Sequence, residues 1–244
     1  MSTRVGVVVP TYNEADTIAE ALDRLHRLAI DDLLVIVVDD ASPDGTADFA
    51  DKAAASWPAN HRLQVMRRPG KSGLGRAYVA GMTAALDAGC ATIVQMDADL
   101  SHPADAIPEM IGKLAEGANV VIGSRYAPGG KLDADWPLSR RLLSRAANTY
   151  VTVLLRLGIA DVTAGFVAWR ADALRSIDLP TIDSNGYAFQ VEMKWRARRH
   201  SMSIVEVPIV FSERAAGSSK MSLPVKIEGL LLPWKLLATF RRRR

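Results

Sequence analysis

The chain has 244 residues, of which 49% are hydrophobic and 23% are charged, and its formal net charge is +3. This composition excludes an intrinsically disordered chain, and the length suffices for one domain with a well-buried core. The charge excess is small and comes without an aromatic-interleaved basic patch or a zinc-ligand spacing, so no nucleic-acid partner is expected. The single cysteine, Cys90, excludes an intrachain disulfide and suits a reducing compartment. Strand pattern begins almost at once, so no signal peptide is expected.

Strand and helix patterns alternate through the first half of the chain. Short apolar runs predict buried strands at residues 5–9, 33–38, 63–66, 93–96 and 120–122. Apolar residues at helical spacing predict helices at residues 14–28, 46–57, 76–88 and 103–116. This alternation favours an α/β fold, a single Rossmann-like domain whose mostly parallel central sheet is flanked by helices.

The second half has a different pattern. We expect a loop at residues 127–136, a long amphipathic helix at 138–157 and an extended segment at 162–169. A helix at 188–199, a strand at 204–211 and a polar loop at 212–220 follow. No internal repeat or linker interrupts the pattern, so residues 1–222 are expected to form one compact domain, followed by a separate segment at 223–244.

Two carboxylates one residue apart, Asp97 and Asp99, follow the strand predicted at residues 93–96. The carboxyl edge of a parallel sheet opens onto a ligand crevice, and two acids at i and i+2 of an extended chain share a side. Such carboxylates repel unless a cation lies between them, and Mg²⁺ or Mn²⁺ prefers oxygen ligands together with substrate phosphates. The alternative is that Asp97 caps the next helix and Asp99 is a solvated turn residue.

Other polar groups also follow predicted strands, and in a doubly wound sheet they would meet at the same edge. They are the segment from Pro10 to Glu14, the pair Asp39 and Asp40, and Lys71 in a basic glycine-rich loop at residues 67–75. This loop lacks the P-loop pattern, and no G-x-G-x-x-G fingerprint follows the first strand. Each group taken alone is better explained as a cap or a solvated residue, whereas their joint occurrence favours a nucleotide site.

Several motifs carry a resemblance to a known family. They are PTYNE at residues 10–14, VDDASPDGT at 38–46, DADLSHP at 97–103, GSRY at 123–126, WPLSRR at 136–141 and ERAAGSSK at 213–220. Together they resemble the family 2 glycosyltransferases of GT-A fold over residues 4–222. The last two motifs are most similar to the dolichol- or polyprenol-phosphate mannose synthases of that family.

The resemblance implies roles for individual residues. The guanosine pocket would include Pro10, Tyr12, Glu14, Val38 and Asp40. The ribose, the diphosphate and the metal would be met by Asp97, Ala98 and Asp99, with Ser101 as a third metal ligand where the family often has glutamine. The phosphates of donor and acceptor would be faced by Arg125 and Arg140, and Arg214 and Lys220 would close over the diphosphate. Lys71 of the glycine-rich loop is expected among the donor-binding residues. The catalytic residues would be Asp99, Arg125 and Arg140.

The implied reaction is transfer of mannose from GDP-mannose to a polyprenyl or dolichyl monophosphate, with inversion and with Mg²⁺ or Mn²⁺ as cofactor. One alternative is a glucosyltransferase that uses UDP-glucose. A sugar nucleotidyltransferase is less expected, since it would need a glycine-rich G-x-x-x-R-x-x-P loop in place of PTYNE. A non-catalytic nucleotide-sugar module would keep Asp40 but has no use for both Asp97 and Asp99.

The C-terminal segment is the predicted contact with the membrane. Residues 227–240 are apolar but too few to cross a bilayer, which takes ~20 residues, and four arginines, Arg241 to Arg244, follow them. This pattern favours an interfacial helix with its arginines at anionic headgroups over a helix packed on the domain. With the lipid acceptor that the resemblance implies, we expect a peripheral protein at the cytoplasmic face of the membrane, and a membrane partner protein stays an option.

Overall fold

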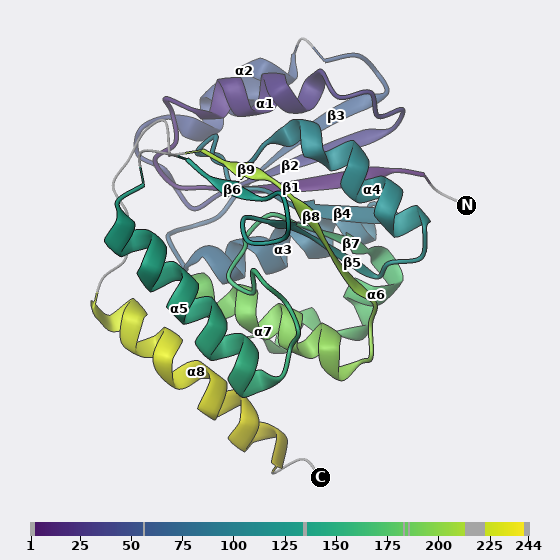
Figure 1. Cartoon of the computed structure of the whole chain (residues 1–244). Helices are drawn as coiled ribbons and strands as arrows, with labels where there is room; N and C mark the ends of the chain where they lie inside the picture. Colours follow the sequence, from purple (N-terminus) through teal and green to yellow (C-terminus); the bar gives the residue numbers. More distant parts are fainter. Residues whose placement is uncertain are drawn as a thin grey trace.

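The computed structural model of the chain describes residues 3–55, 57–133, 136–182, 184, 186–212 and 223–241. Its centre is a seven-stranded sheet with the order β3-β2-β1-β4-β7-β5-β8 (Figure 1). The strands are β1 (Val5–Thr11), β2 (Leu33–Asp39), β3 (His61–Arg67), β4 (Thr92–Gln95), β5 (Val120–Ser124), β7 (Val167–Arg170) and β8 (Ile204–Pro208). All pairings are parallel except those of β7, which runs antiparallel between β4 and β5.

Helices cover both faces of the sheet (Figure 1). One face packs against α1 (Ile18–His26), α2 (Thr46–Ala54) and α4 (Ile107–Ala115), which follows a short 3₁₀ turn, η1 (Ala104–Ala106). The other face packs against α3 (Leu74–Asp87), α6 (Ala171–Ser176) and α7 (Gly186–Arg199), with a second turn, η2 (Leu179–Thr181), between α6 and α7. Beyond α7 lie α5 (Leu138–Leu155) and α8 (Leu223–Arg241). The expected α/β fold is confirmed.

The strands at the centre of the sheet are apolar because both of their faces are covered. Every residue of β1 and of β2 is buried, which accounts for their continuous valine, leucine and isoleucine runs. At the edge, only His61 of β3 is buried, and the other residues of that strand are half-buried or exposed. The carboxyl ends of β1, β2 and β4 therefore meet above a rigid apolar core, and the polar residues that follow these strands gather there.

Some element boundaries differ from the prediction. The first helix begins at Ile18 rather than at residue 14, because Asn13 takes a left-handed conformation (φ 59°) and the N–H groups of residues 14 and 15 donate to Thr46 Oγ1 and Asp44 Oδ2. The segment expected as one strand at 204–211 is split into β8 and β9 (Val210–Phe211). Pro208 lacks the N–H that would continue the ladder, and β9 instead pairs with the short β6 (Lys131–Leu132).

Gly81 of α3 sits where the helix packs most closely on the sheet. A Cβ at this position would lie 2.4 Å from Val8 Cγ1 and 2.8 Å from Val38 Cγ2. We expect Gly81→Ala to lower the free energy of unfolding by about 1–3 kcal/mol, since two strands would have to move. Gly112→Ala in α4 is the matched control: its Cβ meets no atom within 4 Å, so the higher helix propensity of alanine should stabilise the protein slightly. Urea denaturation compares the two, and equal effects would contradict this packing.

Candidate active site

The turn after β4 holds the two aspartates predicted to bind a metal. The N–H of Asp97 donates to His102 Nδ1 at 3.0 Å, which folds the turn back on itself. The His102 ring is buried and stacks on Phe166, with 5.2 Å between ring centroids. Because Nδ1 accepts this hydrogen bond, the neutral ring carries its proton on Nε2.

The Asp97 carboxylate is held from below by α3. Tyr78 Oη donates to Asp97 Oδ1 at 2.7 Å, whereas Asp97 Oδ2 makes no hydrogen bond within the described part of the chain. The pKa of Tyr78 lies well above its usual range, first because the phenol is buried and then because Asp97 and Asp99 are both negative. The two aspartates thus create a local excess of negative charge, as expected of a cation site.

The Asp99 side chain is buried, with 5% of its surface exposed, so the alternative that it is a solvated turn residue is wrong. Its Oδ1 accepts hydrogen bonds from the N–H of Ser101 at 3.1 Å and from Ser101 Oγ at 2.6 Å. Among the described residues no group of three or more His, Cys, Asp or Glu side chains could enclose a metal. The oxygen-bearing side chains of this turn are Asp97, Asp99 and Ser101, and oxygen is the ligand atom that Mg²⁺ and Mn²⁺ prefer. Of the three, Asp97 lines the pocket described next.

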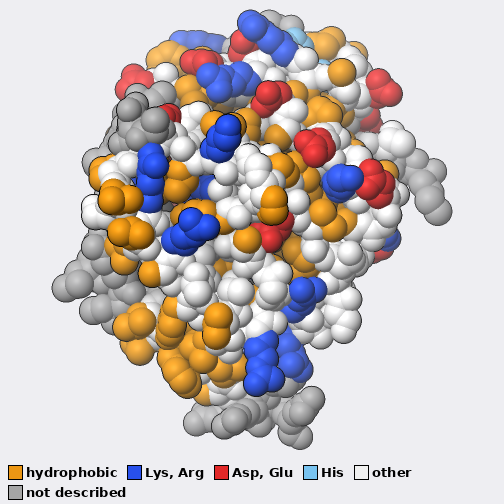
Figure 2. Space-filling view, in the orientation of Figure 1, with side chains coloured by type: hydrophobic (Ala, Val, Ile, Leu, Met, Phe, Trp, Pro, Cys, Tyr) orange, Lys and Arg blue, Asp and Glu red, His pale blue; other side chains and the backbone are white. Residues whose placement is uncertain are grey.

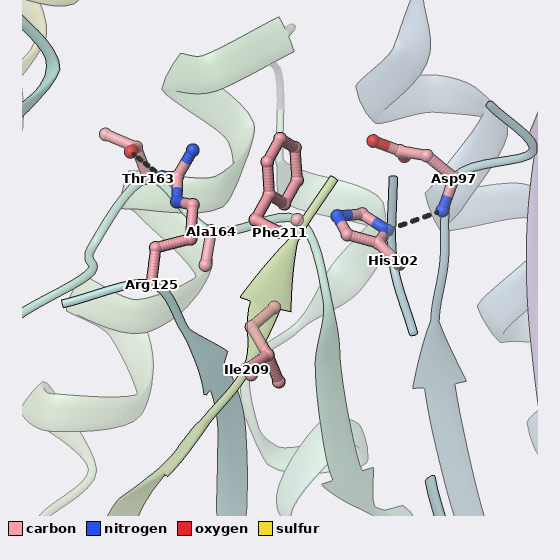
Figure 3. Close-up of a pocket in the computed structure, with 9 residues that line it drawn as sticks. Asp97, His102, Arg125, Thr163, Ala164, Ile209 and Phe211 are labelled. Atoms are coloured by element: carbon pink, nitrogen blue, oxygen red, sulfur yellow. Dashed lines mark hydrogen bonds between the residues drawn. The ribbon is translucent and has the colours of Figure 1, made fainter. Parts of the chain in front are cut away.

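A small pocket with a cavity volume of about 50 Å³ opens beside Asp97. Asp97 and His102 form one wall, and Arg125 and Thr163 form the opposite wall (Figure 3). Phe211 and Ile209 close it from the side of β8 and β9. The Phe211 ring stands between the two walls in Figure 3, with the Arg125 guanidinium 5.2 Å and the His102 ring 5.6 Å from its centroid.

Arg125 is fixed by a buried carboxylate. Its Nε and Nη2 donate to the two oxygens of Asp161 at 2.7 and 2.6 Å, and Nη2 also donates to Thr163 Oγ1 at 2.9 Å. Asp161 has no exposed surface, and its loop is held by Glu206, which accepts the N–H groups of residues 160 and 161. Such a bidentate pair sets the guanidinium in one orientation.

Aromatic rings connect this pocket to the start of α5. The Phe211 ring lies edge-on to Trp136 at 5.8 Å, and the Arg125 guanidinium lies 5.2 Å from the Phe211 centroid. Arg140 stacks on the Trp136 ring at 3.8 Å. Arg140 is therefore placed near the same pocket as Arg125 by cation–π contacts.

The residues predicted to hold the nucleotide lie at the ends of β1 and β2. Asp40 is buried and accepts from Arg68 Nη1 at 2.6 Å and from the Ser72 N–H at 3.1 Å, so it fastens the glycine-rich loop to β2. Lys71 of that loop lies over the Tyr12 ring at 3.8 Å, which brings these two predicted residues together.

The remaining predicted residues differ in accessibility. Glu14 is partly exposed beside Tyr12, whereas Pro10, Val38 and Ala98 are buried. Val38 has no exposed surface, so this conformation does not support the predicted contact between its side chain and a nucleotide. Arg214 and Lys220 lie outside the described residues, and their roles stay predictions.

The family model for glycosyl transferase family 2 matches residues 6–178, more than half of the chain. The chain belongs to glycosyl transferase family 2. It is 48% identical to the undecaprenyl-phosphate mannosyltransferase of Micrococcus luteus over 90% of this chain and 88% of that protein. It is 46% identical to the polyprenol monophosphomannose synthase of Mycolicibacterium smegmatis over 90% of this chain and 81% of that protein. The family expected from the motifs is thus confirmed.

Solved structures show the same fold at low sequence identity. A mycobacterial protein of 22% identity superposes with a TM-score of 0.71, over 95% of this chain and 75% of that one. The glucosyl-3-phosphoglycerate synthase of Mycobacterium tuberculosis, solved with Mn²⁺, UDP and glucosyl-3-phosphoglycerate, has 20% identity and a TM-score of 0.64, over 99% of this chain and 80% of that one. These likenesses place this family 2 glycosyltransferase in the GT-A fold.

Sequence reasoning missed several residues of the site. Tyr78, Asp161 and Phe211 come from helix, loop and strand segments that carry no motif of their own. Only the fold brings Phe211 to the pocket, Tyr78 to Asp97 and Asp161 to Arg125. Asp161, directly before the segment expected to be extended at 162–169, and Thr163 within that segment were the available indication. A buried carboxylate with no basic residue near it in the sequence predicts pairing with a basic residue from a distant segment.

Lys194 of α7 is another buried group that the motifs did not indicate. It has no exposed surface and donates to the carbonyl of Ala164, a residue that lines the pocket, at 2.6 Å. Burial lowers the pKa of Lys194 from 10.5 to about 7, although Asp161 and Glu206 act against this shift.

The lowered pKa of Lys194 predicts a pH dependence of stability. Between about pH 7 and 10 the unfolded chain keeps a proton on Lys194 that the folded chain has lost, so the free energy of unfolding should rise with pH. The slope from this group is at most about 1.4 kcal/mol per pH unit. Urea denaturation at pH 7 and 9.5 should show this rise in wild type and in the exposed control Lys52→Met. The rise should be smaller in Lys194→Met, and parallel curves would contradict the assignment.

Proposed function

We propose that this chain transfers mannose from GDP-mannose to a polyprenyl or dolichyl monophosphate with inversion, giving a β-linked mannosyl phosphate lipid and GDP. The observation that carries the proposal is the small pocket that Asp97 and Arg125 both line, next to the strand ends that carry the predicted nucleotide residues. The names of the 46–48% identical relatives, a polyprenol monophosphomannose synthase and an undecaprenyl-phosphate mannosyltransferase, support the acceptor class and the sugar.

The residues after β4 fit a divalent cation. Asp97 and Asp99 would hold Mg²⁺ or Mn²⁺, with Ser101 next to Asp99 as a further oxygen ligand, and the Mn²⁺ complex of the structurally similar synthase supports this. A bound cation supplies charge stabilisation to the diphosphate leaving group. Tyr78 holds Asp97 in place by its hydrogen bond to Oδ1, so that Oδ2 faces the pocket.

The acceptor needs little activation. A phosphate monoester has a second pKa of about 6, so its attacking oxygen is already ionised at neutral pH and no strong general base is required. Arg125, oriented by Asp161, and Arg140, stacked on Trp136, would place the acceptor phosphate for in-line attack on the anomeric carbon. Inversion follows from a single displacement. Arg214 and Lys220 would close over the diphosphate and balance its charge.

We further propose that residues 1–222 form the catalytic domain and that α8, together with α5, rests on the membrane surface at its cytoplasmic face. No helix in the described ranges combines the length and hydropathy needed to cross a bilayer. Hydrophobic side chains gather over these two helices (Figure 2). The exposed apolar residues on them are Leu138, Leu142, Leu143 and Val153 of α5 and Leu230, Leu231 and Trp234 of α8. Apolar area and an interfacial tryptophan favour binding to a lipid surface.

Full-length variants test the membrane contact better than truncation, because Leu232 and Leu236 of α8 are buried in the core. Leu231→Glu with Trp234→Glu should weaken co-sedimentation with anionic liposomes by about tenfold or more. Phe49→Glu on α2, a similarly exposed residue at the other end of the molecule, should leave it unchanged. Equal co-sedimentation of both variants with the liposomes would show that α8 does not contact the membrane.

A donor screen with a short polyprenyl phosphate tests the reaction itself. Mannosyl lipid should form from GDP-mannose, and EDTA should stop its formation until Mg²⁺ or Mn²⁺ is added back. Glucosyl lipid from UDP-glucose would favour the alternative donor. A nucleotide sugar formed from a sugar phosphate and a nucleoside triphosphate would indicate a nucleotidyltransferase. Donor binding without any product would indicate a binding module, and each of these three results would overturn the proposal.

A further inference from the structure

Helix α5 carries a buried asparagine. Asn148 has 2% of its surface exposed, and the other buried residues of this helix are the apolar Val151 and Leu155. Asparagine is a weak helix former, and an apolar side chain is the usual occupant of a buried position on an amphipathic helix. A buried amide also has to find hydrogen-bond partners within the protein. Neither helix formation nor apolar packing therefore accounts for Asn148.

Outside its own helix, the Asn148 side chain contacts Thr163 in the loop between α5 and β7. Its Oδ1 accepts the N–H of Thr163 at 3.1 Å, and its Nδ2 donates to Thr163 Oγ1 at 3.1 Å and to the Ser144 carbonyl at 3.0 Å. A main-chain N–H can only donate, so the orientation of the Asn148 amide is determined. The contact fixes both the main chain and the side chain of Thr163 relative to α5.

The Thr163 hydroxyl connects Asn148 to Arg125. Arg125 Nη2 donates to Thr163 Oγ1 at 2.9 Å, so this oxygen accepts hydrogen bonds from Asn148 and from Arg125 at the same time. Its own proton is directed at Asp161 Oδ1, 3.5 Å away. Thr163 and Arg125 line the pocket, whereas Asn148 is not among the lining residues. Asn148 can therefore orient the pocket wall without touching a ligand.

The loop between α5 and β7 is attached to three separate elements. Glu206 of β8 accepts two N–H groups of the loop, and Lys194 of α7 donates to one of its carbonyls. Both of these residues hold main-chain groups. Asn148 of α5 also holds the side chain that contacts Arg125, so among these three anchors it has the most direct route to the guanidinium.

We propose that Asn148 is a positioning residue for the acceptor phosphate and that it acts through Thr163 and Arg125. The inference rests on the proposed function, in which Arg125 places that phosphate. Asp161 fixes the guanidinium on one side, and the Thr163 hydroxyl fixes Nη2 on the other. Without Asn148, the Thr163 N–H loses its partner and the hydroxyl is free to turn away from Arg125. The acceptor phosphate then meets a less well-oriented arginine.

Two variants remove the Asn148 amide. Leucine and alanine are both good helix formers, so α5 should persist in Asn148→Leu and in Asn148→Ala. Should the leucine variant fail to fold, the smaller alanine decides, because it leaves room for water beside Thr163. Asn119→Ala is the matched control, since Asn119 Oδ1 accepts the Ser203 N–H at 2.9 Å. Asn119 directly precedes β5 and Arg125 directly follows it, so this control lies at the other end of the strand.

Steady-state kinetics with GDP-mannose and a short polyprenyl phosphate separates positioning from stability, which thermal melting records. Both Asn148 variants should raise the KM of the polyprenyl phosphate about 3–10-fold, which corresponds to one neutral hydrogen bond. They should leave the KM of GDP-mannose unchanged. Asn119→Ala should keep both KM values even if it melts at a lower temperature. An unchanged acceptor KM in a folded Asn148 variant, or an equal rise for both substrates, would overturn the inference.

A double-mutant cycle tests the route through Thr163. Thr163→Val removes the hydroxyl but keeps the N–H and the shape of the side chain. The rise in acceptor KM caused by Asn148→Ala should be smaller in the Thr163→Val background than in wild type, because the two residues act on Arg125 together. Two effects that simply multiply would overturn this route.

Calorimetry with the short polyprenyl phosphate alone distinguishes this inference from the proposed function. Asn148→Ala should bind the lipid phosphate about 3–10-fold more weakly than wild type, whichever sugar donor the enzyme uses. Equal binding by wild type and Asn148→Ala would overturn the role of Asn148. Binding of the lipid phosphate that weakens as expected, together with no mannosyl lipid from wild type, would support the role of Asn148 and overturn only the proposed donor.

Discussion

Asp99→Asn is expected to reduce mannosyl transfer on the order of 10³-fold or more while the protein still folds. Asparagine keeps an oxygen that can accept the hydrogen bonds from the N–H and Oγ of Ser101, so the turn after β4 should persist. The substitution removes the negative charge that would hold the cation at the diphosphate, and electrostatic stabilisation of the leaving group is the main catalytic contribution in this account.

Steady-state kinetics with GDP-mannose and a short polyprenyl phosphate measures the effect of Asp99→Asn. Asp105→Asn, an exposed aspartate on η1 a few residues away, is the matched control and should transfer at the wild-type rate. Thermal melting of both variants should stay close to wild type. Near-normal transfer by a folded Asp99→Asn variant would show that Asp99 serves only the turn.

Asp161→Ala is expected to cost about 3–5 kcal/mol of stability, because it leaves the buried guanidinium of Arg125 without its counter-charge. Asp161 accepts three hydrogen bonds from Arg125, one from its main chain and two from its side chain. For a chain of this size the loss corresponds to a fall in Tm on the order of 10 °C. Transfer should also be lost, since Arg125 no longer has a fixed orientation in the pocket.

The exposed pair of Arg170 and Asp172 provides a contrast. Asp172→Ala should change stability by less than about 1 kcal/mol, as is usual for surface ion pairs. The double substitution Asp161→Leu with Arg125→Met removes both buried charges and should recover part of the lost stability without recovering transfer. If Asp161→Ala melts like Asp172→Ala, the buried pair does not hold this loop.

The sheet and the pair of aspartates were predictable because their causes are local. Buried strands need continuous apolar runs, so residues 33–38 and 93–96 are recognisable without a structure. Polar residues directly after such strands lie at one edge of a parallel sheet, which places Asp40, Asp97 and Asp99 together. The antiparallel insertion of β7 between β4 and β5 was not predictable, since strand order depends on packing between distant segments.

The opposite wall of the pocket could not be predicted in this way. Arg125 was expected to face a phosphate, and the family motif gave no reason to pair it with Asp161, 36 residues further along the chain. Asn148 looks like an ordinary polar residue of α5 until the fold places it against Thr163. These contacts join residues from different elements, and no periodicity or spacing within one segment encodes them.

The central claim is that Asp97 and Asp99 bind a cation together with the diphosphate of a nucleotide sugar. Anomalous diffraction from crystals grown with Mn²⁺ and GDP-mannose tests it most directly. We expect one manganese peak at coordination distance, about 2.0–2.3 Å, from both carboxylates, with the diphosphate on its other side. A nucleotide sugar bound elsewhere, or bound at this edge without a metal peak beside Asp97 and Asp99, would contradict it.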